Sequence, residues 1–523
     1  MTAADGSTPI PFEIVVRKMT LGDFDAVTAL QLECFPGMAP WLREHIESQT
    51  KMFPEGQVVI EIDGEIVASS CSLIVDFTEY DEWHNWKEIA DSGYIRNHDY
   101  DGDTMYGIEI MVSPRHRGMK LARRLYEVRK QIAREFNLKR IIIGGRIPGY
   151  GTYADEMSAR DYVEEVMSKR LFDPVLTVQA SNGFQLVRLI PDYFPTDSES
   201  RGYATFLEWP NIEFLPANAR TRQMRRTMPV RICVVQYLMR PIDDFEDFAS
   251  QCEHFVDVAS DNKSDFVVFP ELLTAQVMSI VKAKRPADAA RALAAYTPQY
   301  LELFTGLAVK YNVNIIGGSQ LVVEEDEELY NVGWLFRRNG TRESQYKLHI
   351  SPNEAWWWGV APGSKLQVFD TDRGKIAILV GYDIQFPELS RVVAAKGANI
   401  VFVPFSAEER YAYLRVRHCA QARAIENQLY VAISGGTGTI PFVDNADLHY
   451  AQSGIFTPSD FPFSRDAIAS ECPPNIENVI IQDLDLELIR RNRLDGTERP
   501  FTQRRSDLYR VQYVTPDGQV EQV

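Results

Sequence analysis

The stretch KIAILVGYDIQFPELSR (residues 375–391) contains a continuous apolar run that ends in a polar turn. A run of this kind is typical of a strand that is buried on both faces of a sheet. Three other segments have the same form, and each of their apolar runs also ends in polar residues: DFVVFPE (265–271), ANIVFVPFS (398–406) and LYVAIS (429–434). Because helical segments alternate with such strands along the chain, we predict an α/β fold with its chemistry at the carboxyl ends of the strands.

The chain is long enough for several domains, since 523 residues exceed what one compact core usually holds. Its 73 acidic residues outnumber its 55 lysines and arginines, and the formal net charge of −18 repels polyphosphate backbones. We therefore expect no nucleic-acid partner. The six cysteines are too few and too scattered for a disulfide scaffold and form no CxxC pair, which is typical of a reducing compartment.

The sequence also shows no segment that would direct the chain to a membrane. No run approaches the roughly 20 apolar residues that a membrane helix needs. The first basic residue, Arg17, follows the apolar stretch 12–16 instead of preceding it, which is the reverse of a signal peptide. We expect a cytoplasmic protein that works without a membrane.

An arginine-rich stretch, NARTRQMRRTM (218–228), divides the chain. Its arginines could bind an anionic partner, but we interpret the stretch as a solvated connector between two acidic domains. We predict a first domain over 12–212, a linker over 213–228, a second domain over 229–510 and a C-terminal tail over 511–523.

In the first domain, a strand, a basic turn and an amphipathic helix follow one another. The strand MYGIEIMV (105–112) leads into SPRHRG (113–118), and LARRLYEVRKQIAREF (121–136) repeats apolar residues at steps of three and four. Backbone N–H groups of such a turn, with a helix N-terminus behind them, suit a pyrophosphate. A basic helix cap that faces water is the alternative.

This unit resembles the acyl-CoA-binding motif of the GNAT acetyltransferases, Arg/Gln-x-x-Gly-x-Gly/Ala, and the resemblance extends over roughly residues 12–210. Arg115 and Gly118 match the motif, whereas Lys120 stands in place of its last glycine. The resemblance implies a twisted, mostly antiparallel sheet flanked by helices, and transfer of an acetyl group from acetyl-CoA to an amine acceptor. It assigns acetyl-CoA binding to Val112, Arg115, Arg117, Gly118, Lys120 and Ala122.

Glu109, in the strand just before the turn, is our candidate for the base of the acetyl transfer. Direct attack of an amine on a thioester requires a group that removes the proton of the amine. A strand glutamate that simply faces solvent is the alternative interpretation of Glu109.

In the second domain, three short motifs occur in order: FPE (269–271), YKLH (346–349) and GYDIQFPELSR (381–391). In this order and spacing they resemble the nitrilase, or carbon–nitrogen hydrolase, superfamily over about residues 229–510. The resemblance implies a four-layer αββα sandwich, a small amide or nitrile as the substrate, no metal, and a homodimer or larger homo-oligomer.

The same resemblance implies the roles of three charged residues. Glu271 would be the general base, Lys347 would stabilise the tetrahedral oxyanion, and Glu354, in PNEAWWWG (352–359), would orient the lysine and the substrate. This division of labour is chemically reasonable, because a thiol needs a nearby base to become a thiolate and a developing oxyanion needs a fixed positive charge.

The nucleophile of this family is absent from its place. The family pattern is Cys-Tyr-Asp, and this chain has Gly-Tyr-Asp at 381–383, so that Gly381 occupies the position of the cysteine. Glycine accepts the strained backbone of such a turn but has no side chain that could attack a substrate. We therefore expect the fold to survive and hydrolysis to be abolished. Cys233, Cys252 and Cys419 lie in other segments and are better explained as core residues.

Two interpretations of the whole chain remain open. In the first, it is a bifunctional enzyme whose hydrolase lacks its nucleophile, either as an engineered trap or as a natural member of the family. In the second, the hydrolase-fold domain is a non-hydrolytic module that binds or positions a ligand for the acetyltransferase. In both, we expect Asp383, Glu388 and Arg391 to form ion pairs that support the turn at residue 381.

Overall fold

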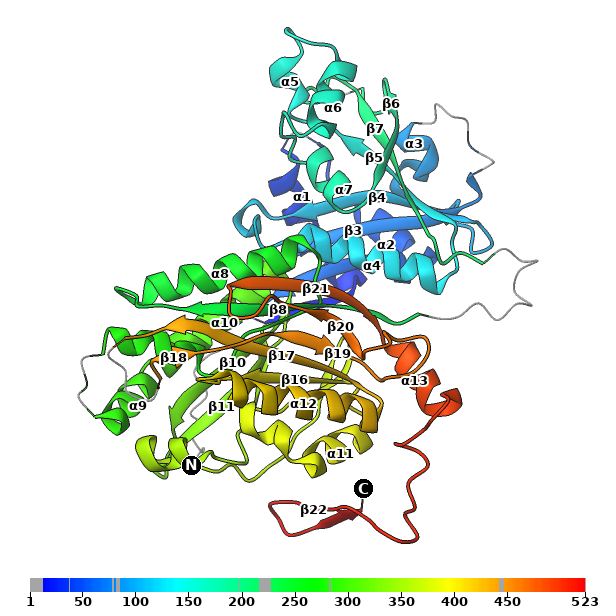
Figure 1. Cartoon of the computed structure of the whole chain (residues 1–523). Helices are drawn as coiled ribbons and strands as arrows, with labels where there is room; N and C mark the ends of the chain where they lie inside the picture. The colour runs from blue at the N-terminus through cyan, green and yellow to red at the C-terminus, as the bar shows by residue number, and fades with distance from the viewer. Residues whose placement is uncertain are drawn as a thin grey trace, which may run out of the picture. The chain divides into compact units, whose positions relative to one another are not determined.

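The computed structural model describes residues 13–36, 38–77, 80, 85–195, 197–215, 227–281, 283, 285–441 and 446–522. The chain forms two compact units, Glu13–Met224 and Arg225–Val523 (Figure 1). Most of the predicted linker, residues 216–226, lies outside the described residues.

The first unit is built on a seven-stranded sheet, in which β4 and β5 are the one parallel pair of neighbours. The other neighbouring strands pair antiparallel, so the predicted mostly antiparallel sheet is confirmed. In spatial order the strands are β1 (Ile14–Lys18), β2 (Val58–Ile62), β3 (Glu65–Val75), β4 (Thr104–Val112), β5 (Arg140–Arg146), β7 (Ala204–Pro210) and β6 (Gln185–Ile190).

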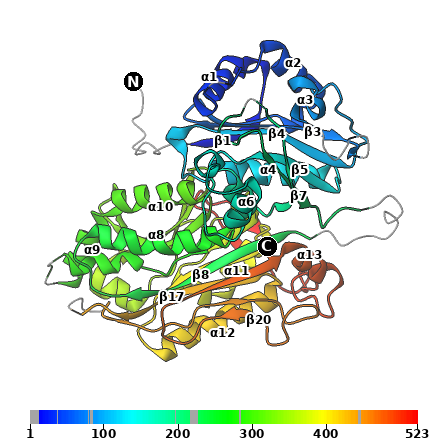
Figure 2. The ribbon, with the colours of Figure 1, turned by 90° about the horizontal axis from the view of Figure 1, so that it is seen from above.

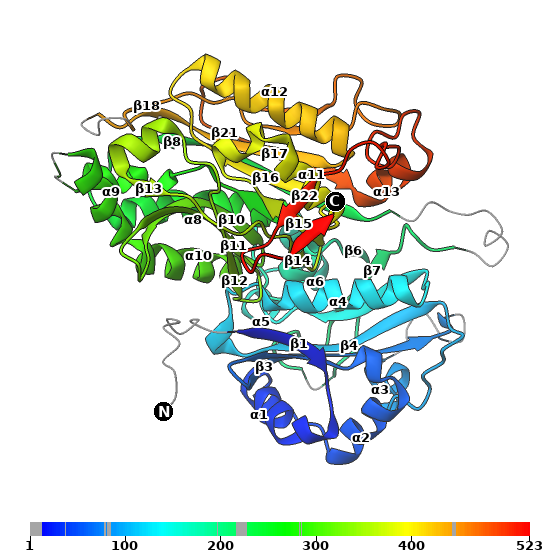
Figure 3. The same ribbon diagram turned by 90° about the horizontal axis from the view of Figure 1, so that it is seen from below.

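Helices cover both faces of this sheet. α1 (Phe24–Cys34) and α2 (Arg43–Met52) lie on one face, and the predicted amphipathic helix, α4 (Leu121–Glu135), lies on the other (Figures 2 and 3). Val27 of α1 and Ile46 of α2 are fully buried in the core that these two helices form with the sheet. The shorter helices of the unit are α3 (Trp86–Ile89), α5 (Tyr150–Tyr153), α6 (Ala159–Met167) and α7 (Leu176–Ser181).

A β-bulge in the middle of this sheet separates β4 from β5. Cys71 of β3 pairs with Glu109 of β4 and Ser72 pairs with Gly107, so Ile108 is an extra residue. β4 and β5 pair only as far as Gly107, although β4 continues beyond it. Because a bulge bends its strand, the end of β4 diverges from β5 and leads into the basic turn before α4.

The second unit is the four-layer αββα sandwich that its sequence resemblance implies. Its main strands form one continuous hydrogen-bonded series. The parallel pairing of β8 with β17 connects the two halves of that series. In spatial order these are β12 (Arg342–Tyr346), β11 (Leu329–Phe336), β10 (Asn314–Val323), β9 (Phe266–Val268), β8 (Pro229–Met239), β17 (Tyr430–Thr439), β16 (Ile400–Phe405), β15 (Gly374–Ile378) and β14 (Phe369–Thr371).

Further strands and the helices complete this unit. The strands are β13 (Val360–Ala361), β18 (Leu448–His449), β19 (Gly454–Phe456), β20 (Ile468–Glu471), β21 (Asn478–Asp485) and a separate pair, β22 (Gln512–Val514) with β23 (Val520–Gln522). The helices are α8 (Phe245–Asp261), α9 (Pro286–Ala294), α10 (Thr297–Tyr311), α11 (Pro387–Ala395), α12 (Arg410–Asn427) and α13 (Leu486–Asp495).

Alternate residues of the strands face different layers of the sandwich. In β16, Ile400 and Phe402 point into the inner core between the two halves of the sheet, whereas Val401 and Val403 pack against α11 and α12. Phe402 meets Phe266 of β9 across the inner core, with ring centroids 5.3 Å apart. α8 and α10 cover the other outer face (Figure 1). The continuous apolar runs of the sequence are therefore strands that are buried on both sides.

A second bulge, in β10, shapes the loop that carries Glu271. The register shifts between Ile316 and Ser319, and Gly318 adopts a φ of +71°. A β-carbon at Gly318 would lie 1.9 Å from the carbonyl oxygen of Pro270, so only glycine permits this close approach. The next residue, Ser319, accepts a hydrogen bond from the Leu272 N–H at 3.0 Å. The bulge thus holds the backbone on both sides of Glu271.

We expect Gly318→Ala to destabilise the second unit by roughly 2–4 kcal/mol, because it adds backbone strain to a steric overlap with Pro270. Gly306→Ala is the matched control: Gly306 lies in α10 with open space around its Cα, so alanine there should stabilise the unit by about 0.5–1 kcal/mol. Denaturant unfolding measures both changes, and equal stability of the two variants would contradict this account of the loop.

Candidate active site

A buried ammonium group lies between two carboxylates in the second unit. Nζ of Lys347, at the end of β12, donates hydrogen bonds of 2.7 Å to Oε1 of Glu271 and of 2.7 Å to Oε2 of Glu354. Glu271 follows β9, and Glu354 begins a short π-helix, Glu354–Trp358. The structure therefore brings together the three charged residues that the sequence singled out, and the Lys347 side chain is only 3% exposed.

Neutral groups complete the hydrogen bonds of the two carboxylates. Nδ2 of Asn331, in β11, donates to Glu271 and to Glu354 at 3.0 Å each. The hydroxyl of Ser351 donates to Glu354 at 2.7 Å, and the N–H of Ser406 donates to Oε2 of Glu271 at 2.9 Å. Buried charges are tolerated when they are paired and hydrogen-bonded in this way, so the site is held in one arrangement.

The surroundings shift the pKa values of the two glutamates in opposite directions. Burial raises the pKa of Glu271 above its usual value, the Lys347 ammonium offsets part of this effect, and the Glu354 charge adds to it. Burial also acts to raise the pKa of Glu354, but Lys347 and the hydrogen bonds from Ser351 and Asn331 outweigh it and lower that pKa. The two glutamate charges overcome burial and raise the pKa of Lys347. Glu271 is therefore the group of the three that is best suited to accept a proton.

Gly381 lies directly against Glu271. It begins the turn Gly381–Gln385 after β15, with a φ of +48° that lies in the left-handed region. A β-carbon at this position would lie 2.2 Å from Oε2 of Glu271, so the carboxylate fills the space of a side chain at 381. A larger residue at 381 would therefore require the Glu271 carboxylate to shift, and its side chain would touch the candidate base.

Asp383 holds this turn, but not in the way that we expected from the sequence. It accepts hydrogen bonds from the backbone N–H groups of Leu348 (3.1 Å) and His349 (2.8 Å), and it lies 2.9 Å from His349 Nδ1. The partner of Asp383 is thus the segment at 348–349, with His349 as its only side-chain contact described, and the Arg391 guanidinium donates to a main-chain carbonyl, that of Glu426. Asp383 instead joins the turn to the segment that carries Lys347.

The cysteines named as possible substitutes do not reach this site. Cys233 and Cys252 are fully buried in the core beneath α8, and burial raises the pKa of the Cys233 thiol to about 12. Cys419 packs at the edge of the core under α11 and α12. None of the hydrogen bonds described for Glu271, Lys347 or Glu354 involves a thiol.

In the first unit, Glu109 lies at the β4 bulge and is partly buried. Trp41 Nε1 and Gln31 Nε2 each donate a hydrogen bond of 3.2 Å to its carboxylate. Burial raises the pKa of Glu109 to about 7, although Trp41 and the charge of Arg129 act in the opposite direction. A carboxylate with this pKa suits a general base near neutral pH.

The basic turn that follows β4 has the open form that an anion requires. Gly118 has a φ of +91°, and a β-carbon there would meet no atom within 4 Å. Lys120, in place of the motif's last glycine, adopts the left-handed conformation that favours glycine and forms the N-cap of α4. The first-turn N–H groups of α4 follow directly, and Ala122 belongs to that turn. Arg115 points elsewhere, to Glu65 at 2.8 Å and Glu33 at 3.4 Å.

Arg129 is a residue of this site that our sequence analysis missed. Its guanidinium is buried under the bulge and donates to the carbonyls of Cys71 (2.7 Å) and Glu109. A β-carbon at Gly107 would lie 2.6 Å from its Nη1, so that glycine makes room for it. The sequence pattern that could have identified it is an arginine on the apolar face of α4, four residues after Leu125. Asn331 gave a similar signal, as a polar residue in an otherwise apolar strand.

Among the residues that the structure describes, no group of three or more His, Cys, Asp or Glu side chains is arranged to hold a metal ion. None of the helices described is both long and apolar enough to span a bilayer.

Comparisons with known proteins match both units. Residues 231–493 match the family of carbon–nitrogen hydrolases, and residues 24–152 match the acetyltransferase (GNAT) family. The probable hydrolase YhcX of Bacillus subtilis (strain 168) is 55% identical over 501 residues, which cover 96% of this chain and 97% of YhcX. The similarity to YhcX therefore extends through both units.

Two further matches concern one unit each. The uncharacterized N-acetyltransferase YkwB of Bacillus subtilis (strain 168) is 36% identical over 209 residues, which cover 39% of this chain and 92% of YkwB. The crystal structure of Saccharomyces cerevisiae Nit3, a member of branch 10 of the nitrilase superfamily, covers 53% of this chain and 97% of its own. That match has 23% sequence identity and a TM-score of 0.43.

We expect Lys347→Met to destabilise the second unit by about 3–5 kcal/mol, because it leaves two buried carboxylates without their counter-ion. The loss should be larger at about pH 8 than at about pH 5. Without the ammonium, the folded-state pKa values of Glu271 and Glu354 rise above the unfolded value of about 4.3. Stability then falls as the pH rises from the unfolded-state pKa through the folded-state pKa values.

Lys310→Met is the matched control, since Lys310 pairs with Glu253 at 2.6 Å but its side chain is 52% exposed. We expect this variant to lose at most about 1 kcal/mol, with little dependence on pH. Urea unfolding at the two pH values measures both variants. A Lys347→Met deficit as small as that of the control would show that the buried charges are not coupled.

Proposed function

Because the chain belongs to the carbon–nitrogen hydrolase family and carries a GNAT acetyltransferase domain before it, we propose that it combines an amidase-type site with an acetyl-CoA-dependent N-acetyltransferase. We propose further that hydrolysis is abolished in this chain, since glycine occupies the position of the nucleophile. The single observation that carries the first proposal is the buried Glu271–Lys347–Glu354 cluster against Gly381.

The cluster has the groups that amide hydrolysis by a thiol needs. With a cysteine at 381, Glu271 would take the proton of the thiol, and the thiolate would attack the carbonyl carbon of the amide. Lys347 would stabilise the negative charge on the carbonyl oxygen, and Glu271 would return the proton to the leaving ammonia. Water, deprotonated by Glu271, would then hydrolyse the thioester to a carboxylic acid and restore the thiol.

With Gly381, this series of reaction steps lacks its first bond-forming step. Glu271 and Lys347 can still bind a polar amide, but glycine at 381 offers no side chain that could form the covalent intermediate. Removal of the nucleophile from a serine protease lowers turnover on the order of 10⁶-fold, and we propose a comparable loss here. The substrate class that fits the site is a small amide or nitrile.

For the first unit, the residues fit acetyl-CoA as a co-substrate. The turn at Gly118 and the N-terminus of α4 offer backbone N–H groups to the pyrophosphate, with Val112, Arg117, Lys120 and Ala122 around them. Glu109 would accept the proton of the amine as it attacks the thioester. What supports this proposal is the divergence of β4 from β5 next to a carboxylate whose pKa is about 7.

We expect Gly381→Cys to release ammonia from at least one member of a panel of small amides, whereas the unaltered chain releases none above background. The gain follows because the new thiol would lie against Glu271. Ammonia is measured by a coupled assay over the same panel for both proteins.

Two variants control this experiment. Glu271→Gln, made in the Gly381→Cys background, removes the base and should abolish the gain. Gly381→Ala, made in the unaltered chain, alters the backbone equally without adding a thiol and should remain inactive. If the cysteine variant folds but hydrolyses none of the amides, the second unit is better explained as a ligand-binding module.

We expect acetyl-CoA to bind the full chain with saturable heat in titration calorimetry, and Gly118→Trp to abolish that heat by filling the turn. Gly518→Trp is the matched control, because Gly518 has a similar φ of +82° and open space but lies in the second unit. Heat that survives Gly118→Trp, or no saturable heat with the unaltered chain, would remove the acetyltransferase proposal.

A further inference from the structure

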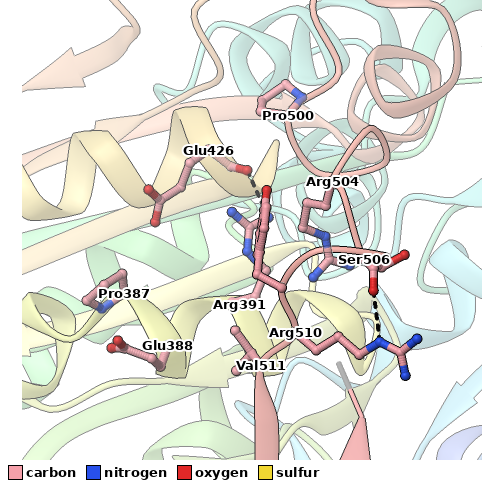
Figure 4. Close-up of a pocket in the computed structure, with 10 residues that line it drawn as sticks. Pro387, Glu388, Arg391, Glu426, Pro500, Arg504, Ser506, Arg510 and Val511 are labelled. Atoms are coloured by element: carbon pink, nitrogen blue, oxygen red, sulfur yellow. Dashed lines mark hydrogen bonds between the residues drawn. The ribbon is translucent and has the colours of Figure 1, made fainter.

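The second unit contains a cavity of about 470 Å³ that the proposed reactions do not use. It lies between the first turn of α11, the end of α12 and the C-terminal arm, which we define as residues 496–522 (Figure 4). Three arginines line it: Arg391 from α11, and Arg504 and Arg510 from the arm. In a chain with a net charge of −18, this concentration of positive charge calls for an explanation.

Contacts on both sides of the cavity fix the C-terminal arm. Before the cavity, the Phe501 ring packs against the core under α11 and α12. After it, Val511 and Tyr513 pack against the same core, and the Tyr513 hydroxyl accepts a hydrogen bond from the Leu366 N–H at 3.0 Å. Lys396, which directly follows α11, also pairs with Glu521 at 2.7 Å. The segment that bridges these anchors therefore encloses a defined space.

The hydrogen bonds of two of these guanidinium groups go to main-chain oxygens. Arg391 donates to the carbonyl of Glu426 at 3.1 Å, and Arg504 donates to the carbonyl of Phe501 at 2.9 Å. Both lie over the Phe501 ring, at 5.6 Å and 5.1 Å from its centroid. On the same arm, by contrast, Arg505 forms a 2.6 Å ion pair with Asp507. Main-chain and aromatic contacts position a guanidinium without neutralising its charge.

The two carboxylates of the cavity do not balance the arginines. Glu426, the first of them, also pairs with Arg423 at 3.3 Å, so its charge is shared between two guanidinium groups. Glu388 is the second carboxylate. Burial lowers the pKa of Arg391 and the positive charge of Arg504 lowers it further, although the Glu426 charge acts in the opposite direction. A bound anion would relieve this repulsion between like charges.

From this arrangement we propose that the cavity is a binding site for a small oxyanion, a phosphate- or carboxylate-bearing molecule, held between the guanidinium groups of Arg391 and Arg504. Planar guanidinium groups bind such oxygens in pairs, and a cavity of this size holds a small molecule. The site adjoins the turn at residue 381, because two residues that line it, Pro387 and Glu388, follow the turn Gly381–Gln385 almost directly. Arg423, the partner of Glu426, also donates to the carbonyls of Ile384 and Gln385, both at 3.1 Å.

Titration calorimetry of the full chain with inorganic phosphate, at constant ionic strength in chloride, tests the proposal. Succinate serves as a second probe and distinguishes a carboxylate from a phosphate ligand. We expect saturable binding of at least one probe, and binding at least tenfold weaker in Arg504→Gln and in Arg391→Gln, because each loses a charged donor. Arg505→Gln, the matched control on the same arm, should bind as the unaltered chain does.

The arginine variants also separate this site from the basic turn of the first unit, which could bind phosphate independently. Binding that is unchanged in both Arg391→Gln and Arg504→Gln would overturn the proposal, as would the absence of saturable binding of either probe. Arg504 lies on the exposed arm, so Arg504→Gln keeps the test valid if Arg391→Gln fails to fold. Thermal unfolding without ligand verifies that each variant is folded.

Discussion

The pairing of the Lys347 ammonium with two buried carboxylates is the interaction on which the second unit's site depends. Glu271 and Glu354 tolerate burial because Lys347 lies 2.7 Å from each of them, and the lysine tolerates it for the same reason. The surrounding structure maintains this geometry. The β10 bulge at Gly318 holds the loop of Glu271, and Asp383 joins the segment of Lys347 to the turn at residue 381.

Both units place a carboxylate of raised pKa beside an irregular strand. Glu109 lies at the bulge of β4, and Glu271 lies against the bulge of β10. The two carboxylates differ in their partners, because Trp41 and Gln31 give Glu109 neutral donors whereas Lys347 gives Glu271 a full charge. A bulge re-aims a side chain without ending the sheet, so regular strands can bring a charged group to a defined point.

Much of this arrangement could be predicted from the sequence, but its supporting contacts could not. Apolar runs that end in polar residues gave the strands of the sandwich, and the order of three motifs indicated the residues that meet at the site. Asn331 and Arg129 were missed because their roles depend on distances between strands and helices that no local pattern encodes. The contacts of Asp383 and Arg391 were not foreseen for a related reason, since main-chain groups bind both side chains and Asp383 also lies 2.9 Å from His349 Nδ1.

The central claim is that the second unit keeps the charged groups of an amidase around a position without a nucleophile. Peptide-resolved mass spectrometry of chains treated with a halogenated acetamide tests it most directly. The account predicts that Gly381→Cys gains an adduct at residue 381 faster than at the partly exposed Cys34 or Cys419, and that the unaltered chain gains none in the peptides of Glu271 and Lys347. An adduct in those peptides of the unaltered chain, or a cysteine at 381 that reacts more slowly than the other two, would contradict the account.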